Sequence, residues 1–178
     1  MPKIGFDEGT VFLDDVQASR FVDPKVLELE VIDNEGRAWP LMAGSHDETE
    51  RNYGLFDGDR LIAFLKLISP DVTAEDCPTC FWSIARVAVL DPWMTRGIAS
   101  ALVGAVMLHF RAPVASDVDQ TPGGAAVWKR YIRSHPGEVA IYSGSTVLGG
   151  VVWNGERFEP DPWADRCVRL VRHPPDVG

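Results

Sequence analysis

The chain has 178 residues, of which 46% are hydrophobic, and a formal net charge of -9. That length suits one domain with a sizeable core and is short for two. The acidic balance argues against general nucleic-acid or membrane-surface binding, which needs a basic surface to neutralise phosphate. No segment has the roughly 20 apolar residues that span a bilayer, and the N-terminus lacks an apolar secretion segment. We therefore expect a single cytoplasmic domain, residues 1–178, with no membrane or nucleic-acid partner.

The first half of the chain has the pattern of antiparallel strands. Residues 25–33 alternate apolar and acidic side chains, and residues 37–43 follow after a turn. Two candidate strands, 51–56 and 60–68, flank an Asp-Gly pair, which favours a hairpin because glycine adopts positive backbone angles easily. We expect four antiparallel strands here.

The second half alternates strands and helices. Residues 81–90 are rich in β-forming side chains and predict a central strand, ended by Pro92. The helix that follows, up to Phe110, is apolar on every side and must be buried. Next come a short strand, a second helix and a further strand, at residues 112–118, 121–135 and 138–142. This order predicts an α+β (mixed α/β) fold with a central, mostly antiparallel, mixed sheet and helices packed on both faces.

The two ends of the chain are rich in proline. We place the core of the domain at about residues 26–142. Residues 143–178 are expected to form a hairpin, which turns at Asn154-Gly155, and a loose tail.

The three cysteines are an odd set and do not suggest a disulfide framework. Cys77 and Cys80 have the spacing of a metal knuckle or a redox pair, and Cys167 with His173 could complete four zinc ligands. Because the chain has no second C-x-x-C pair, we expect ordinary thiols and no metal site.

The start of the apolar helix has the features of an anion site. A helix start presents free backbone N–H groups and a partial positive charge. Before Gly97, Thr95 is the candidate capping residue, and Arg96 adds a full positive charge. Gly97 lets a phosphate approach the backbone, and Ala99 and Ser100 keep the first turn small. These residues predict a cradle for a pyrophosphate.

At this point the chain resembles the GCN5-related N-acetyltransferases (the GNAT family). Their cofactor signature, [RQ]-x-x-G-x-[GA], follows a central strand and opens a helix. Gly97 and Ala99 match this pattern, whereas Met94 stands where the family has Arg or Gln. The P-loop and dinucleotide-binding glycine motifs are not present. The resemblance covers about residues 52–142 in element order and implies an acyl-CoA acyltransferase fold.

The resemblance implies direct transfer of acetyl from acetyl-CoA to a primary amine of a small molecule or protein, by a monomer or homodimer. Backbone groups of two residues on the central strand would bond the pantetheine arm, and the helix start would hold the pyrophosphate. The cofactor-binding residues implied are Val87, Val89, Met94, Thr95, Arg96, Gly97, Ile98, Ala99, Ser100 and Trp128. Residues 116–130 also look like a segment of bacteriophage acetyltransferases, which implies an enzyme that acts inside a bacterial host.

The reaction needs a route for the amine proton and stabilisation of the leaving thiolate. The family often places a tyrosine near the second helix, where this chain has Trp128; Tyr131 lies one helical turn further on. Tyr131 is the candidate acid, and direct proton exchange with water is the alternative. Asp117 and Asp119 are the candidate bases. The loop before the central strand offers two other acids, Glu75 and Asp76.

Two other functions compete with the acyltransferase. One is a catalytically inactive binding or regulatory protein of the same fold, such as a phage protein that captures a host partner. Met94 and Trp128, at two signature positions, favour it. The other is a zinc-stabilised interaction domain built on the Cys77 and Cys80 pair. The sequence favours the acyltransferase because the order of strands and the cofactor motif both agree with the GNAT family.

Overall fold

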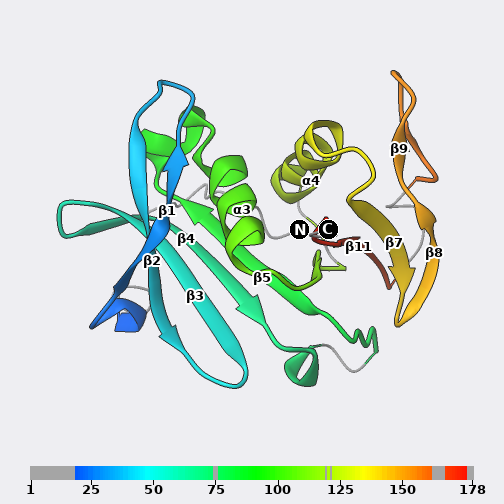
Figure 1. Cartoon of the computed structure of the whole chain (residues 1–178), viewed down its shortest axis with the longest axis horizontal. Coiled ribbons are helices and arrows are strands. Elements are labelled where there is room, and N and C mark those ends of the chain that lie inside the picture. Colours follow the sequence, from blue (N-terminus) through cyan, green and yellow to red (C-terminus); the bar gives the residue numbers. More distant parts are fainter. Residues whose placement is uncertain (1–18, 74–75, 119, 121, 162–166, 176–178) are drawn as a thin grey trace.

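The computed structural model describes residues 19–73, 76–118, 120, 122–161 and 167–175 (Figure 1). Its central feature is a sheet of nine described strands in the order β1-β2-β3-β4-β5-β6-β11-β7-β8. These strands are β1 Lys25–Ile32, β2 Ala38–His46, β3 Glu50–Asp57, β4 Arg60–Ile68, β5 Trp82–Val89, β6 Val114–Ala115, β7 Val139–Ser143, β8 Thr146–Gly150 and β11 Val168–Arg172. A separate hairpin pairs β9, Val152–Trp153, with β10, Phe158–Glu159.

The pairing confirms a mixed, mostly antiparallel sheet. β1 to β5 pair in sequence and antiparallel, as the sequence predicts. β5 then pairs with β6 in parallel, while the other pairs among the described strands are antiparallel. Gly58 adopts a positive φ of 61° between β3 and β4, which is the backbone freedom that this hairpin turn requires.

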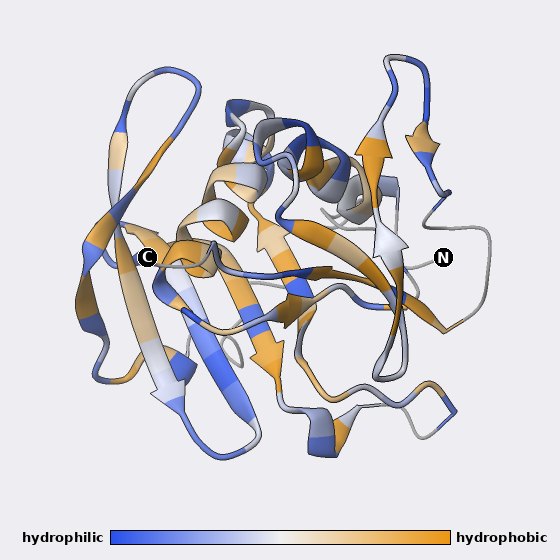
Figure 2. Ribbon diagram, turned by 45° about the vertical axis from the view of Figure 1, so that its right-hand side comes forward, coloured by the Kyte–Doolittle hydropathy of each residue, from blue (hydrophilic) through white to orange (hydrophobic). Residues whose placement is uncertain are grey.

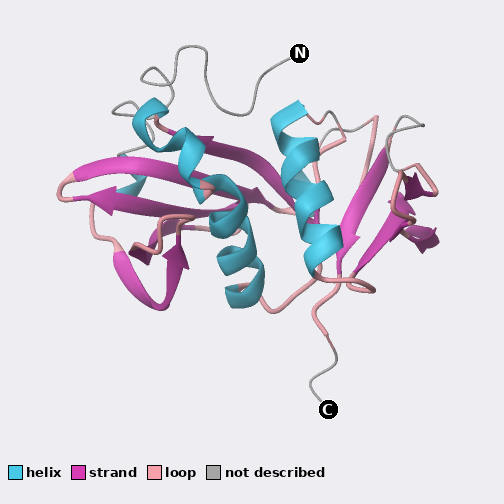
Figure 3. Ribbon diagram, turned by 90° about the horizontal axis from the view of Figure 1, so that it is seen from above, coloured by secondary structure: helices cyan, strands magenta, loops and turns pink. Residues whose placement is uncertain are grey.

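The two described α-helices are α3, Ile98–His109, and α4, Pro122–Ser134, and they lie side by side (Figure 3). Both bury apolar side chains in one hydrophobic cluster with the strands, although Leu108 of α3 is 61% exposed. Three short 3-10 helices are also described: η1 Ser19–Phe21, η2 Pro70–Val72 and η3 Asp91–Arg96. No helix in the described ranges is long and apolar enough to cross a membrane.

A smaller cluster lies apart from the main one. Phe21 of η1 packs there against Leu61, Phe64 and Ala88. Ala88 and its strand neighbour Val89 belong to different clusters, so the two clusters cover opposite faces of β5. The prediction of helices packed on both faces is not confirmed: among the described residues, α3 and α4 share one cluster and η1 packs in the other. Figure 2 shows apolar central strands and mostly hydrophilic turns.

The C-terminal region needs a correction. The sequence predicts a hairpin and a loose tail after residue 142, and the turn between β9 and β10 does include Asn154, whose side chain accepts hydrogen bonds from the backbone N–H groups of Glu156 and Arg157. β8, however, pairs with β7, and β11 is a buried strand between β6 and β7. β11 is five residues long and lies among charged and proline residues, so its sequence does not distinguish it from a tail.

The cysteine prediction was also wrong. Cys77 and Cys167 form a disulfide that joins positions 90 residues apart, with a Cα–Cα distance of 5.0 Å, and Cys80 is free and exposed. With two of the three cysteines bonded to each other, the zinc set suggested by the spacing cannot form in this state. The described residues contain no group of side chains that could hold a metal ion.

A buried arginine joins both helices to the last strand. Arg172 on β11 donates to the Met107 carbonyl of α3 at 2.9 Å, and its Nε contacts the Tyr131 hydroxyl and the Glu138 carboxylate, each at 3.2 Å. The Arg172 side chain is 3% exposed. Since a buried guanidinium must be paired, these partners fix where β11 lies against α3 and α4.

The Arg172→Ala variant is expected to lose about 3–5 kcal/mol of unfolding free energy, because it leaves the Glu138 carboxylate partly buried without its cation. Urea unfolding measures the loss. Arg157→Ala is the control: Arg157 pairs with Glu159 but is 75% exposed, so its loss should stay within about 1 kcal/mol. Equal losses in the two variants would contradict this role for Arg172.

Candidate functional site

The last half of β5 has an open side. β5 pairs with β6 only at Trp82 and Ser83 among the described residues, and beyond Ser83 its paired neighbour is β4 alone. The Leu90 N–H donates to the Ile62 carbonyl of the β4 side at 2.9 Å. Because alternate residues of a strand face the same neighbour, the backbone N–H and C=O groups of Val87 and Val89 face away from β4.

A β-bulge sets this orientation. Arg86 pairs with Lys66 and Ile84 pairs with Leu67, so Ala85 is an extra residue in β5. Ile84 and Val87 lie three positions apart and yet both enter the main hydrophobic cluster, which an unbulged strand would not allow. Bulges commonly lie next to active sites, where they redirect backbone groups. Sequence reasoning did not predict this bulge, because no residue type marks it.

The start of α3 lies directly after this strand. η3 ends at Arg96, and Gly97 takes the N-cap position with a positive φ of 71° and no side-chain cap. The first intrahelical bond runs from the Ala101 N–H to the Gly97 carbonyl at 3.2 Å. The N–H groups of Ile98, Ala99 and Ser100 therefore precede the first bond of the helix and carry its partial positive charge.

Arg96 is held by the turn between β1 and β2. Its guanidinium lies 3.2 Å from the Asp33 carboxylate and also contacts the Glu35 carboxylate. Asn34 reinforces the contact: its N–H donates to the Arg96 carbonyl at 2.9 Å, and its side chain donates to the Thr95 carbonyl at 3.0 Å. The sequence predicts Arg96 as a cation for the ligand, whereas the structure places its charge against two acids that fix η3.

Asp33 is the centre of this arrangement, and sequence reasoning did not single it out. Its side chain is fully buried, accepts from the backbone N–H groups of Glu35 and Arg37 at 2.9 and 3.0 Å, and accepts from the Trp39 indole at 3.1 Å. Burial opposes its ionisation, but these bonds and the Arg96 charge together hold the pKa of Asp33 below its ordinary value.

A cation from α4 reaches the helix start. A Cβ built on Gly97 would lie 3.8 Å from a guanidinium nitrogen of Arg130 and 3.7 Å from the Cβ of Asn34. The described atoms nearest to this point thus belong to one cation and one amide. Sequence reasoning missed Arg130 because no local pattern links it to Gly97, which lies on the other side of α3 and β6 in the chain.

Two other predicted cofactor residues differ in exposure. Met94 on η3 is 41% exposed, and Trp128 on α4 is 4% exposed within the main cluster, where its ring lies 6.3 Å from that of Tyr131. Trp93 packs partly against the same cluster, with the Arg60 guanidinium 5.7 Å from its ring. Met94 is therefore placed for surface contact, and Trp128 for packing.

Tyr131, the candidate acid, is bound inside the protein. Its hydroxyl donates to the Glu138 carboxylate at 2.8 Å and accepts from Arg172 at 3.2 Å, and its ring stacks on His135. Burial, and next the hydrogen bond to Glu138, raise the pKa of Tyr131 to about 12. The hydroxyl thus holds its proton firmly in this arrangement.

Of the candidate acids, Asp117 and Asp76 are described, and both lie outside helices and strands. Asp117 follows β6, and its carboxylate accepts from the Val118 N–H at 2.7 Å. Asp76 lies next to the disulfide, where its carbonyl is 3.4 Å from the Cys167 sulfur. Asp119 and Glu75 lie outside the described residues.

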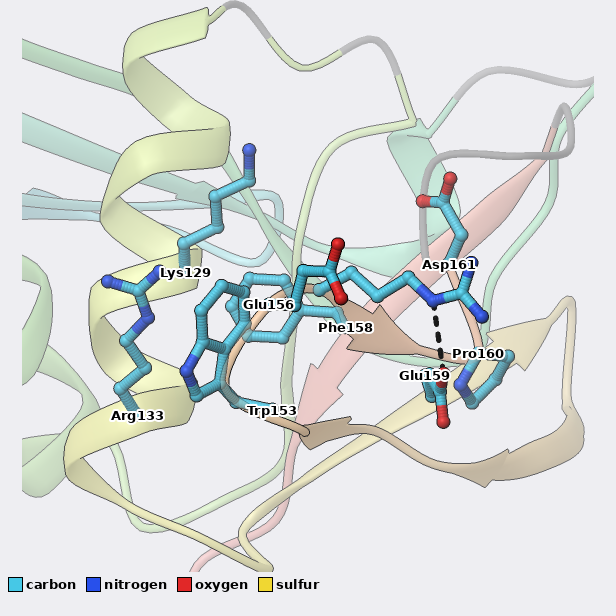
Figure 4. Close-up of a pocket in the computed structure, with 9 residues that line it drawn as sticks. Lys129, Arg133, Trp153, Glu156, Phe158, Glu159, Pro160 and Asp161 are labelled. Atoms are coloured by element: carbon cyan, nitrogen blue, oxygen red, sulfur yellow. Dashed lines mark hydrogen bonds and ion pairs between the residues drawn. The ribbon is translucent and has the colours of Figure 1, made fainter.

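A cavity of about 660 Å³ lies between α4 and the β9–β10 hairpin (Figure 4). Arg133 stacks over Trp153 at 4.0 Å, and Arg157 pairs with Glu159 at 3.0 Å. The lining residues are Lys129, Arg133, Trp153, Glu156, Arg157, Phe158, Glu159, Pro160 and Asp161. Cations and carboxylates are equal in number there, so the cavity has no net preference for an anion, unlike the start of α3.

Comparison with known proteins gives structural neighbours only: no protein-family model and no curated protein matches the chain. One similar solved structure belongs to a protein assigned to the GNAT acetyltransferases of Bacteroides thetaiotaomicron, with TM-score 0.38, 14% identity and coverage of 73% of this chain and 64% of that one. Another is the Bacillus subtilis N-acetyltransferase YlbP in complex with coenzyme A, with TM-score 0.38, 16% identity and coverage of 78% and 70%. Solved structures similar to the chain thus include acetyltransferases, and one of them holds coenzyme A.

The Asp33→Asn variant is expected to melt at a lower temperature than the parent at pH 7. An amide removes the charge that Arg96 faces and leaves fewer acceptors for Trp39 and the turn. The folded-state pKa is lowered, so the stability from the Asp33 carboxylate is present above its ordinary pKa and is lost as the pH falls through the folded value. The difference in melting temperature between the parent and Asp33→Asn should therefore shrink as the pH is lowered from 7 into the acidic range.

The control for this prediction is Asp57→Asn. Asp57 also pairs with an arginine, Arg37 in the turn between β1 and β2, at 3.1 Å. The Asp57 side chain, however, is 44% exposed. An exposed pair contributes little, so this variant should melt close to the parent. An unchanged melting temperature in Asp33→Asn would contradict the central role assigned to Asp33.

Proposed function

We propose that the chain is an acyl-CoA-dependent N-acyltransferase of the GNAT type, which transfers acetyl from acetyl-CoA to a primary amine. The observation that carries this proposal is the pairing of two features at one place. The open backbone groups of Val87 and Val89 lead along β5 toward the uncapped start of α3 at Gly97. An extended, amide-rich arm that ends in a pyrophosphate is a ligand that can use both.

The start of α3 is proposed to bind the pyrophosphate. The N–H groups from Ile98 to Ser100 and the helix dipole favour an anion, and Gly97 leaves room for one against the backbone. Arg130 is proposed to supply the positive charge that the signature otherwise takes from position 94, where this chain has Met94. The site around the α3 N–H groups and Arg130 is proposed to be shaped by Thr95, Arg96 and Trp128.

The chemical step is proposed to be direct attack of the amine on the thioester carbonyl. A C–N bond forms, the C–S bond breaks, and the proton lost by the amine balances the thiolate that leaves. Asp117 and Asp119 are proposed as the groups that accept the amine proton, and Tyr131 or water as the donor to the thiolate. The acceptor, the cytoplasmic location, the oligomeric state and the phage origin stay predictions from the sequence.

A second candidate function is a binding protein that holds acyl-CoA without transferring the acyl group. The observation in its favour is the network around Tyr131, whose proton is held by Glu138 beside Arg172. Acetyl-CoA binding with no thiol release across a panel of primary amines would support it. Release of free coenzyme A with any acceptor would favour the enzyme instead.

The Gly97→Glu variant is expected to abolish acetyl-CoA binding, measured by isothermal titration calorimetry. The new carboxylate would stand where the pyrophosphate is proposed to bind, next to Arg130. The control is Gly137→Glu, at a glycine with φ of +86° and no atom within 4 Å of the built Cβ. Both variants place a glutamate at a glycine of positive φ, +71° and +86°, and add the same charge, so the control separates position from strain and charge.

Binding that survives in Gly97→Glu, with the variant folded, would contradict the proposed pyrophosphate site. Loss of binding in Gly137→Glu as well would show that strain or charge alone accounts for the effect. The proposal requires loss in the first variant and retention in the second.

Tyr131→Phe tests the candidate acid. If the hydroxyl donates to the leaving thiolate, kcat should fall about 100-fold, in the range typical of general acids, with little change in KM. The measurement is thiol release with the best acceptor of the amine panel, together with a melting curve. An unchanged kcat would assign the proton route to water and leave Tyr131 as part of the Arg172 network.

A further inference from the structure

Two of the three cysteines are bonded to each other, and the third lies close to one of them along the chain. Cys77, in the segment before β5, is bonded to Cys167, which directly precedes β11. Cys80 lies three residues after Cys77 in the C-x-x-C spacing of a redox pair, and its thiol is free and exposed. One sulfur, that of Cys77, therefore has a bonded partner and a second thiol nearby along the chain.

We propose that this cluster is a thiol–disulfide exchange site in which Cys77 changes partner between Cys167 and Cys80. The Cys80 thiolate attacks the Cys77 sulfur, the Cys77–Cys167 bond breaks, and a Cys77–Cys80 bond forms. Cys167 leaves as a thiolate and takes up the proton that Cys80 gave up. One disulfide and one thiol stand on each side of the reaction, so no external oxidant or reductant is needed.

The local backbone allows the exchange. Residues 77–81 form neither helix nor strand, so a change of shape there breaks no strand pairing. Cα atoms three residues apart are separated by at most about 11 Å, and a disulfide needs about 4.4–6.8 Å. A bend at Pro78 and Thr79 closes that difference. The 3.2 Å hydrogen bond from the Phe81 N–H to the Thr79 hydroxyl lies in this segment and adjusts with the bend.

A buried cation lies beside the bond that breaks. Arg169 stands two residues after Cys167 and donates to the Cys77 carbonyl at 3.0 Å and to the Ser116 carbonyl at 2.9 Å. Its Nε is buried with no hydrogen-bond partner among the described residues, so one donor of this guanidinium is unused. A positive charge next to a cysteine favours the thiolate, which helps Cys167 to leave.

The exchange would change how β11 is tethered. In the Cys77–Cys167 form, a covalent bond ties the start of β11 to the segment before β5. In the Cys77–Cys80 form, β11 keeps its strand pairing and the Arg169 bonds but loses that tie. Small thiols and disulfides of the cell would then meet an exposed Cys80 in one form and a freed Cys167 in the other.

Peptide mapping tests the proposal on the whole chain. The protein, purified without reductant, is held at pH 8, alkylated with iodoacetamide and cut with trypsin. The Cys77–Cys167 form links the tryptic peptide of residues 67–86 to that of residues 167–169. The exchanged form gives an alkylated 167–169 peptide, together with a 67–86 peptide that is lighter by two hydrogen atoms.

Cys80→Ser is the matched control, since it removes the attacking sulfur at an exposed position and leaves the disulfide. We expect alkylation of Cys167 in the parent at least about tenfold above that in Cys80→Ser, together with the internal Cys77–Cys80 bond. Equal alkylation of Cys167 in the two proteins, or the absence of any disulfide from both, would overturn the proposal. Neither result depends on acetyl-CoA binding, so the proposed function is tested separately.

Discussion

The position of the candidate site depends on one buried carboxylate. Asp33 binds the backbone of its own turn, the indole of Trp39 in the core, and the guanidinium of Arg96 on η3. A buried charge is tolerated only where such partners surround it, so the three contacts are fixed together or lost together. Because η3 leads directly into Gly97, the contact between Asp33 and Arg96 sets where α3 begins relative to β1.

The open side of β5 has a different cause. β6 is only two residues long and pairs with the beginning of β5, so the parallel contact ends at Ser83. β11 then pairs with β6 and β7 and not with β5. The second half of the sheet is therefore joined to the first through a short contact, and Arg172 adds side-chain links from β11 to α3 and α4. The free backbone of Val87 and Val89 follows from that topology.

Much of this could be predicted from the chain alone. Strands β1 to β5 and both helices follow from hydrophobic alternation, turn residues and Pro92, all of which are local signals. The partners of the key residues are not local. Asp33 lies 63 residues before Arg96, and Cys77 lies 90 residues before Cys167. No periodicity links such positions, which is why the buried carboxylate, the disulfide and β11 were missed while the glycine at the start of α3 was found.

The charge of the protein restricts how an anion can bind at that start. The chain carries a net charge of -9, and the cation nearest to the motif in sequence, Arg96, is engaged by Asp33 and Glu35. An anionic ligand at Gly97 therefore needs positive charge from the helix N–H groups and from another element. Arg130 on α4 is placed for this, because its guanidinium lies close to Gly97. Residues 95 and 96 are thus held by the turn between β1 and β2, and the proposed anion site at Gly97 relies on the neighbouring helix α4 for its charge.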